Sequence, residues 1–320
     1  MVVRQPAFTR SKKNPFQIKD IQVFDDETLQ RIAEHETFGL QPQQLAYSLQ
    51  QGPTALLERI TNLLSGERRT QFLEHLQQPL STTEVEQAQQ RVLNALFWEL
   101  TYWKTPELYE ELTSGERLHP GIFRDLESDL RYRVILDVGA GSGRASFACL
   151  RHGARLVYAI EPSPGLRRIL SHKLNHQPVP GHLIVREGRF DSVPLADNSV
   201  DIALSCSAFT AQTEQGGEPG LQELQRVTRP GGKIILIWPR GEDRDWLTAR
   251  GFHYVTLPMR QPMRIRFRSL HSALHCIRHF YPRNQAVLRY VLTRKTPEIP
   301  FPLVGMHPPT DYCWLEVRKA

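Results

Sequence analysis

The sequence predicts an α/β protein with a doubly wound, mostly parallel sheet of seven strands and a helical N-terminal extension. From residue 132 onward, short apolar runs of strand length alternate with amphipathic segments and short links, the pattern of a parallel sheet covered on both faces. A glycine-rich turn follows the first of these runs. The preceding region, up to about residue 130, carries apolar residues at helical spacing instead.

Seven apolar runs are the predicted strands, and the segments between them are the predicted helices. The strands are expected at residues 132–139, 155–161, 182–188, 199–209, 233–239, 252–258 and 312–319. The helices are expected at residues 144–153, 164–177, 220–232, 243–251, 269–282 and 284–295, where proline often opens and glycine often closes the segment.

Three parts are expected along the chain: a flexible basic tail over residues 1–20, a helical extension or lid over 21–118, and the α/β domain over 119–320 with a substrate-side insertion at 259–311. Within the extension, residues 81–104 predict one long helix, which Ser81 and Glu84 open as a capping box.

Composition limits the function classes. A hydrophobic content of 40% is enough for a core, and no apolar run approaches the length that spans a bilayer. The basic N-terminus has no apolar segment of the kind found in secretory signals. The four cysteines form no C-x-x-C pair, which disfavours a zinc site or a disulfide framework. We therefore expect a cytoplasmic protein with no membrane partner and no bound metal.

The net charge of +6 is unevenly distributed. Residues 1–19 carry five Lys or Arg and residues 260–295 carry nine, with no acid in either segment, so the remainder holds 26 basic against 34 acidic residues. Basic segments of this kind can bind anions or nucleic acid, although a solvated tail and a solvated face are the simpler interpretation.

The glycine-rich turn carries the strongest functional signal. Asp137 closes the first strand, and Gly139, Gly141 and Gly143 follow at alternate positions. Glycines at such a turn permit unusual backbone angles and let a ligand approach the main chain. The dinucleotide fingerprint requires glycine or alanine where this chain has Arg144, which disfavours an NAD(P)-binding oxidoreductase and leaves it as an alternative.

Together with three later motifs, this turn resembles the class I, Rossmann-like S-adenosylmethionine-dependent methyltransferases. The later motifs are an acid ending the second strand in VYAIEPS, the stretch EGRFDSVPLADNSVD, and ELQRVTRPGGKIILIW. The resemblance covers roughly residues 120–258 and implies the fold, S-adenosyl-L-methionine as cofactor, and methyl transfer to an O, N or C atom.

The resemblance also implies a cofactor site. Asp137 would help to hold the ammonium group of the cofactor, the glycine turn would supply backbone contacts, and Glu161 would accept the ribose hydroxyls. Where related proteins often have an acid for the adenine, this chain has Arg189, so Phe190 and a neighbouring backbone amide, or Asp191 as a substitute acid, are expected to hold the ring. The full predicted set is Asp137, Gly139, Ala140, Gly141, Gly143, Glu161, Pro162, Arg189, Phe190, Ser205, Tyr102 and Trp103, the last two as a lid.

Candidates for a catalytic base are few. His119 precedes the first core strand and is the only candidate, with a capping role as the simpler interpretation. His271, His275 and His279 recur every four residues, which suits a pocket or a metal, but the segment offers no partner carboxylate, and a polar helix face is favoured.

The acceptor is expected to be a small molecule, because the Asn- or Asp-Pro-Pro-aromatic signature of nucleic-acid amino methyltransferases is absent after the fourth strand. Arg264, Arg266 and Arg268 suggest that the acceptor is anionic. An RNA methyltransferase and a non-catalytic cofactor-binding protein stay open as alternatives, as do the acceptor atom and the oligomeric state.

Overall fold

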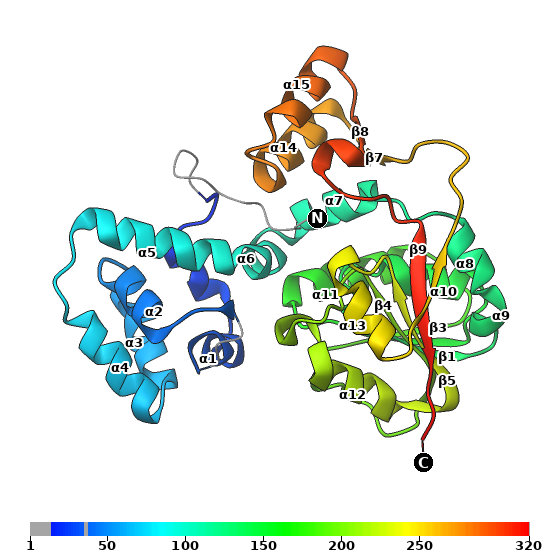
Figure 1. The fold of residues 1–320 in the computed structure, drawn as a ribbon, viewed down its shortest axis with the longest axis horizontal. Helices are drawn as coiled ribbons and strands as arrows, with labels where there is room; N and C mark the ends of the chain where they lie inside the picture. Colours follow the sequence, from blue (N-terminus) through cyan, green and yellow to red (C-terminus); the bar gives the residue numbers. More distant parts are fainter. Residues whose placement is uncertain (1–13, 35–37, 320) are drawn as a thin grey trace. The chain divides into compact units, whose positions relative to one another are not determined.

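The computed structural model describes residues 14–34 and 38–319, and the chain divides into two compact units after Pro106 (Figure 1). The first unit, residues 5–106, is helical throughout its described part, and the second carries both sheets. The sequence placed this division at residue 118. Helix α7 (Pro106–Gly115) instead belongs to the second unit almost entirely, because its acids Glu110 and Glu111 form ion pairs there with Lys173 and Arg268.

The N-terminal unit is built from short amphipathic helices around an apolar core. Its elements are η1 (Ile18–Val23), α1 (Asp26–Glu34), α2 (Pro42–Leu49), α3 (Thr54–Leu63), α4 (Gly66–Leu76), α5 (Thr82–Ala95) and α6 (Phe97–Lys104). The largest fully buried side chains of this core include Phe24, Phe72, Phe97, Ile32 and Leu49. The capping box at the start of α5 is confirmed: Ser81 Oγ accepts from the Glu84 amide, and the Glu84 carboxylate accepts from the Ser81 amide.

Two boundaries differ from the prediction in this unit. The expected helix over 81–104 is divided at Leu96, whose backbone leaves the helical range although no proline or glycine stands there. Leu96 and Phe97 are both buried, so packing sets the bend. The expected tail also ends earlier than residue 20, because Phe16 is buried and Asn14 is hydrogen-bonded to Gln90. Residues 1–13 of that predicted tail lie outside the described residues.

The second unit contains a seven-stranded sheet of the predicted kind, in the order β3-β2-β1-β4-β5-β9-β6. Its strands are β1 (Val134–Val138), β2 (Leu156–Ile160), β3 (His182–Arg186), β4 (Val200–Cys206), β5 (Thr228–Ile237), β6 (His253–Thr256) and β9 (Asp311–Glu316). All neighbours pair in parallel except β9, which runs antiparallel to both β5 and β6. The strand order reverses at β1 and β4, and ligands of open α/β sheets bind outside the carboxyl ends of strands at such a point.

Helices cover both faces of this sheet (Figure 1). On one face, α10 (Arg144–Arg151) and α11 (Pro164–His176) bury Phe147 and Leu170 against Ala159. On the other face, α12 (Gly217–Val227) and α13 (Arg244–Ala249) pack into the larger apolar cluster. The remaining short helices of this region are α8 (Gly121–Asp125), α9 (Glu127–Leu130), η3 (Thr213–Gln215) and η4 (Gly241–Asp243).

The insertion between β6 and β9 folds as a small substructure of its own. A two-stranded antiparallel sheet joins β7 (Arg264–Arg266) to β8 (Glu298–Pro300), and the chain between them forms α14 (Leu270–Phe280) and α15 (Gln285–Arg294), followed by η5 (Phe301–Val304). Helices α14 and α15 lie where the sequence predicted helices. Of the described helices, none is both long and apolar enough to cross a membrane.

Candidate functional site

The glycine-rich turn links β1 to α10 in a backbone conformation that suits glycine. Gly139, Gly141 and Gly143 all have positive φ angles, of 67°, 56° and 91°. A Cβ atom on Gly143 would lie 2.3 Å from a methyl carbon of Leu170, and one on Gly139 would lie 2.8 Å from Ala208 Cβ. The turn is therefore tightly packed at its two ends. A Cβ atom on Gly141 would lie 3.9 Å from its nearest neighbour, Tyr109 Cε1, so the middle of the turn has room on that side.

Asp137 lies beneath this turn, fully buried at the end of β1. One carboxylate oxygen accepts a 2.5 Å hydrogen bond from Ser146 Oγ on α10, and the other oxygen, Oδ1, has no hydrogen-bond partner among the described residues. Burial raises the pKa of Asp137 to about 6, although the Ser146 hydrogen bonds and the charge of Arg144 oppose that rise. A buried carboxylate oxygen without a donor is costly, and it marks a place where a ligand or water can bind.

Glu161 follows β2 and is also buried. Its two carboxylate oxygens accept hydrogen bonds from the Gly141 amide at 2.8 Å and from the Ser163 amide at 2.9 Å. The carboxylate therefore ties the end of β2 to the open middle of the glycine-rich turn. Pro162 stands between these contacts, and its carbonyl accepts from Arg167. The structure thus brings together Asp137, the turn and Glu161, as the sequence predicted.

The predicted adenine side is formed by Phe190, whose ring edge would lie 3.0 Å from a Cβ on Gly139. Phe190 contacts Phe209 edge-to-face at 5.3 Å between ring centroids. The amide of Arg189 forms a local turn with Ser192. Ser205 is buried in β4, and its hydroxyl has no hydrogen-bond partner. An adenine-binding role for these residues stays a prediction.

The predicted lid residues Tyr102 and Trp103 belong to α6 of the N-terminal unit, where Trp103 packs edge-to-face on Phe24 at 5.5 Å. Their role as a cofactor lid stays a prediction. Tyr109 on α7 is the aromatic residue whose ring lies nearest to Gly141. Tyr109 follows Tyr102 and Trp103 closely in the sequence, but its spacing from them did not distinguish it as a site residue.

His119 occupies a turn before α8, as its simpler interpretation predicted. Its Nδ1 accepts a 3.1 Å hydrogen bond from the Gly121 amide, and its own amide donates to the Pro309 carbonyl. A ring nitrogen that already accepts a backbone hydrogen bond is not free to remove a proton, so the geometry favours a structural role over catalysis.

The three histidines of α14 do not form a common site. His279 is buried, and burial lowers its pKa to about 4, whereas His271 and His275 are more exposed. Over the described residues, no group of three or more His, Cys, Asp or Glu side chains is arranged to hold a metal ion. The prediction of a polar helix face is therefore wrong for His279.

The arginines that suggested an anionic acceptor are paired within the insertion. Arg264 donates to the Tyr290 hydroxyl at 2.9 Å, and Arg266 pairs with Glu298 across β7 and β8 at 3.3 Å. Arg268 pairs with the buried Glu111 of α7 at 2.5 Å. These contacts hold the insertion together and attach it to α7, so the arginines do not by themselves indicate an acceptor site.

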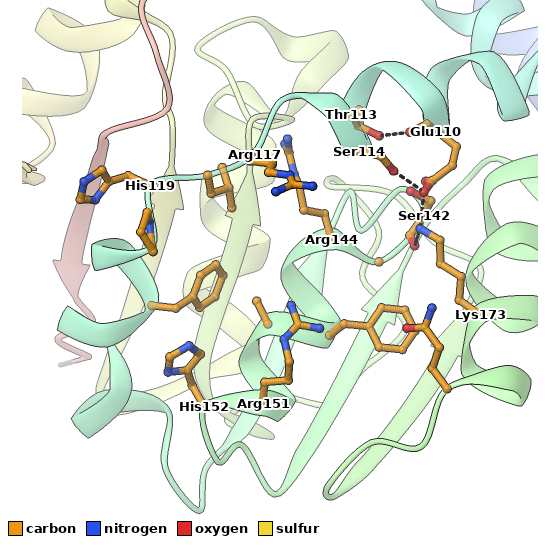
Figure 2. A pocket seen from close by; sticks show the side chains of 17 residues that line it. Glu110, Thr113, Ser114, Arg117, His119, Ser142, Arg144, Arg151, His152 and Lys173 are labelled. Carbon is orange, nitrogen blue, oxygen red and sulfur yellow. Dashed lines mark hydrogen bonds and ion pairs between the residues drawn. The ribbon is translucent and has the colours of Figure 1, made fainter. Parts of the chain in front are cut away.

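A pocket of about 520 Å³ opens beside the glycine-rich turn, on the α10 side (Figure 2). The pocket could not be predicted from the sequence, because its walls come from three stretches of chain, residues 110–123, 142–152 and 173–177. It is lined by α7, the following loop, α10 and α11, with Glu110, Arg117, His119, Ser142, Arg144, Phe147, Arg151, His152 and Lys173 among its residues.

Arg144 connects this pocket to the end of β4. Its guanidinium donates to the Glu116 carbonyl at 3.0 Å and to Ser207 Oγ at 2.7 Å. Ser207 follows the last residue of β4 with a φ of 57°, which is uncommon for a residue other than glycine. Arg144 therefore forms structural hydrogen bonds from the position where the dinucleotide fingerprint has glycine or alanine.

Comparison with known proteins identifies the class. Residues 136–236 match the family of methyltransferase domains, and residues 4–97 match the family of FliG C-terminal domains. An uncharacterized methyltransferase of Geobacillus kaustophilus is 28% identical over 165 residues, which cover 49% of this chain and 73% of that protein. One of Mycobacteroides abscessus is 36% identical over 135 residues, which cover 40% of this chain and 46% of that protein. The chain thus spans less than half of some of its curated relatives.

Among solved structures, a methyltransferase of Aquifex aeolicus, described as dependent on S-adenosylmethionine, is 19% identical. It aligns over 48% of this chain and 91% of its own, with a TM-score of 0.41. Residues 136–236 therefore resemble a methyltransferase domain, and the observed strand order agrees with the Rossmann-like sheet that the sequence predicted.

Proposed function

We propose that this chain binds S-adenosyl-L-methionine and transfers its methyl group to a small molecule. One observation carries the proposal: two buried carboxylates, Asp137 and Glu161, stand at the ends of neighbouring parallel strands on either side of an open, positive-φ glycine turn. Carboxylates in these positions repel a diphosphate, but they suit a cofactor with an ammonium group and a ribose diol.

The residues present fit such a cofactor. Each oxygen of Glu161 accepts one backbone hydrogen bond and, as a carboxylate oxygen, can accept another, so hydroxyl donors can bind without breaking the existing contacts. Asp137 Oδ1 lacks a donor, which an ammonium group or a bridging water would supply. Gly141 leaves the main chain uncovered where a ligand would approach.

The bound cofactor would supply an electrophilic methyl group on a sulfonium, which is already a good leaving group. The work left to this chain is to hold the acceptor atom in line, since positioning of reactants lowers a barrier substantially. Among the described residues, we find no candidate for a catalytic base other than His119. The ring of His119 is itself held in a turn by the Gly121 amide. We therefore expect an acceptor atom that is deprotonated at neutral pH or loses its proton to water.

A small-molecule acceptor is favoured over RNA by the volume of the pocket beside the turn. About 520 Å³ lies within the range of roughly 300–1,000 Å³ that is usual for small-molecule sites. The missing Asn- or Asp-Pro-Pro-aromatic signature after β4 also argues against methylation of a nucleobase amine. The acceptor can offer an O, N or C atom.

Isothermal titration calorimetry of the purified chain tests the cofactor assignment. We expect saturable binding of S-adenosylmethionine and of its demethylated product, and no binding of NAD⁺ or NADP⁺. The variant Glu161→Gln should weaken binding by roughly 10-fold or more, because hydrogen bonds to a charged group contribute about 1.5–3 kcal/mol.

Glu187→Gln is the matched control, since Glu187 is an exposed acid on the loop after β3 that pairs with Arg167. Binding should be unchanged in this variant. If the chain saturates with a nicotinamide dinucleotide and ignores both sulfur compounds, the proposal is wrong.

A further inference from the structure

The pocket beside the glycine-rich turn has an unusual concentration of positive charge. Arg117, Arg144, Arg151 and Lys173 all line it, whereas Glu110 is the only acid among the lining residues. Figure 2 shows Arg117 and Arg144 close together on one side of the pocket, with Arg151 and His152 on another side. The pocket shares only Gly143 with the predicted cofactor set, so it is a separate place in the fold.

Two of these four cations already have partners within the fold. Lys173 Nζ forms an ion pair with Glu110 at 2.6 Å and also donates to the Ser142 carbonyl at 3.1 Å. Arg144 interacts electrostatically with the buried Glu116, which lies just outside the lining. Neither cation therefore needs a ligand to balance its charge.

Arg117 and Arg151 differ from that pair. Both are exposed, and over the part of the chain that the structure describes neither guanidinium has a hydrogen bond or an acidic partner. His152, next to Arg151, contacts Glu127 at 3.3 Å, so that acid is directed to the histidine. Two unneutralised guanidinium groups within one concave site make it attractive to anions.

The backbone adds to this preference. Helix α10 begins at Arg144, and this residue lines the pocket together with Ser142 and Gly143 just before it. The N-terminal end of a helix carries a partial positive charge and unpaired amide groups, which favour a nearby anion. The contribution of α10 has the same sign as that of Arg117 and Arg151.

We propose that this pocket binds a small molecule that carries at least two anionic groups, phosphate or carboxylate. One group would be bound by Arg117 and the start of α10, and the other by Arg151. A ligand with two anionic groups is specified because the two unneutralised arginines stand on different sides of the pocket, so a single small anion would leave one of them unpaired. The same pocket supports the small-molecule acceptor of the proposed function, but the inference does not use the carboxylates proposed to bind the cofactor, so the two proposals can fail separately.

Calorimetric titration of the full chain with pyrophosphate, citrate and inorganic phosphate tests the proposal. At low salt, pyrophosphate or citrate should bind at least 10-fold more tightly than inorganic phosphate, and binding should weaken as salt is added. The preference between pyrophosphate and citrate tells whether phosphate or carboxylate groups suit the pocket better.

The double variant Arg117→Gln/Arg151→Gln should lower this affinity at least 10-fold, while S-adenosylmethionine binds as in the wild type. Arg278→Gln is the matched control: Arg278 is an exposed arginine on α14, outside the pocket, and its loss should change neither affinity. An unchanged melting temperature verifies that the double variant is folded.

Three results would overturn the inference: no binding of pyrophosphate or citrate to the wild type, equal binding to the double variant, or an equal loss in the Arg278 control. A fourth is retention of a short single-stranded RNA that depends on Arg117 and Arg151 when neither small anion binds, which would assign the surface to nucleic acid. None of these outcomes depends on whether the cofactor proposal holds.

Discussion

The arginines of the insertion and those of the pocket have the same charge but different surroundings. Arg264, Arg266 and Arg268 stand in one acid-free stretch of sequence, yet Arg264 is hydrogen-bonded to Tyr290, and Arg266 and Arg268 pair with acids from outside the stretch. Arg117 and Arg151 are separated in sequence by 34 positions and have no such partner among the described residues.

A basic segment of sequence therefore does not always form a basic surface in the folded protein. Acids supplied by β8 and α7 neutralise Arg266 and Arg268, although no acid is near them in sequence. A binding site for an anion requires cations that the fold leaves without a counter-charge.

A carboxylate without a counter-charge should behave differently from a paired one as well. The strongest effect is expected at Asp137, a buried acid that forms no ion pair with any described residue. Burial holds its pKa at about 6, against 3.8 for the free side chain. The native state therefore keeps a proton that the unfolded chain has lost, so this group's contribution to stability falls as pH rises from 4 to 7. The decrease is at most about 3 kcal/mol.

The variant Asp137→Asn should remove this decrease. Urea unfolding of both proteins between pH 4.5 and 7.5 measures it as the difference between the two curves. The buried His279, with a pKa near 4, acts in the opposite direction because it resists protonation in the native state, and it is present in both proteins. Parallel curves would show that Asp137 ionises normally and would contradict the assigned environment.

A smaller effect is expected from Arg268→Gln, which leaves the carboxylate of Glu111 without its cation. The Arg268 side chain is 82% exposed, but that of Glu111 is only 9% exposed, so the loss should destabilise the fold by about 1–2 kcal/mol. Arg278→Gln, on the same insertion, serves as control and should leave the urea midpoint unchanged. Equal midpoints for all three proteins would mean that the Arg268 pair is not structural.

The smallest effect is expected at the pocket. Because Arg117 and Arg151 are exposed and without acidic partners, replacing both with Gln should change the free energy of unfolding by no more than about 0.5 kcal/mol. Chemical denaturation measures this in the absence of anions. A loss as large as that of Arg268→Gln would show that these side chains stabilise the fold, and the distinction between the two sets of arginines would fail.

The alternation of apolar and amphipathic segments was enough to predict the parallel sheet and its flanking helices. Strands and helices of this kind follow from residues close in sequence, and so do the capping box at Ser81 and the glycine turn after β1. The bend at Leu96 and the anchoring of Phe16 were not predictable, because both depend on what those side chains pack against.

Part of the candidate site could be predicted from the sequence. Asp137, the three glycines and Glu161 were predicted from motifs that resemble a known family, and parallel strands place their carboxyl ends at one edge of the sheet. Tyr109 and the cationic pocket were missed, because α7, α10 and α11 reach the pocket from distant parts of the chain.

Most strands and helices, the turn at the end of β1 and the two acids beside it could be predicted from the order of the residues, because each depends on local conformation and on regular spacing. Which charges are neutralised, and which stay exposed in a cavity, depends on the tertiary fold. Coulombic interactions depend on distance in space and on burial, and neither quantity is written in the order of the residues.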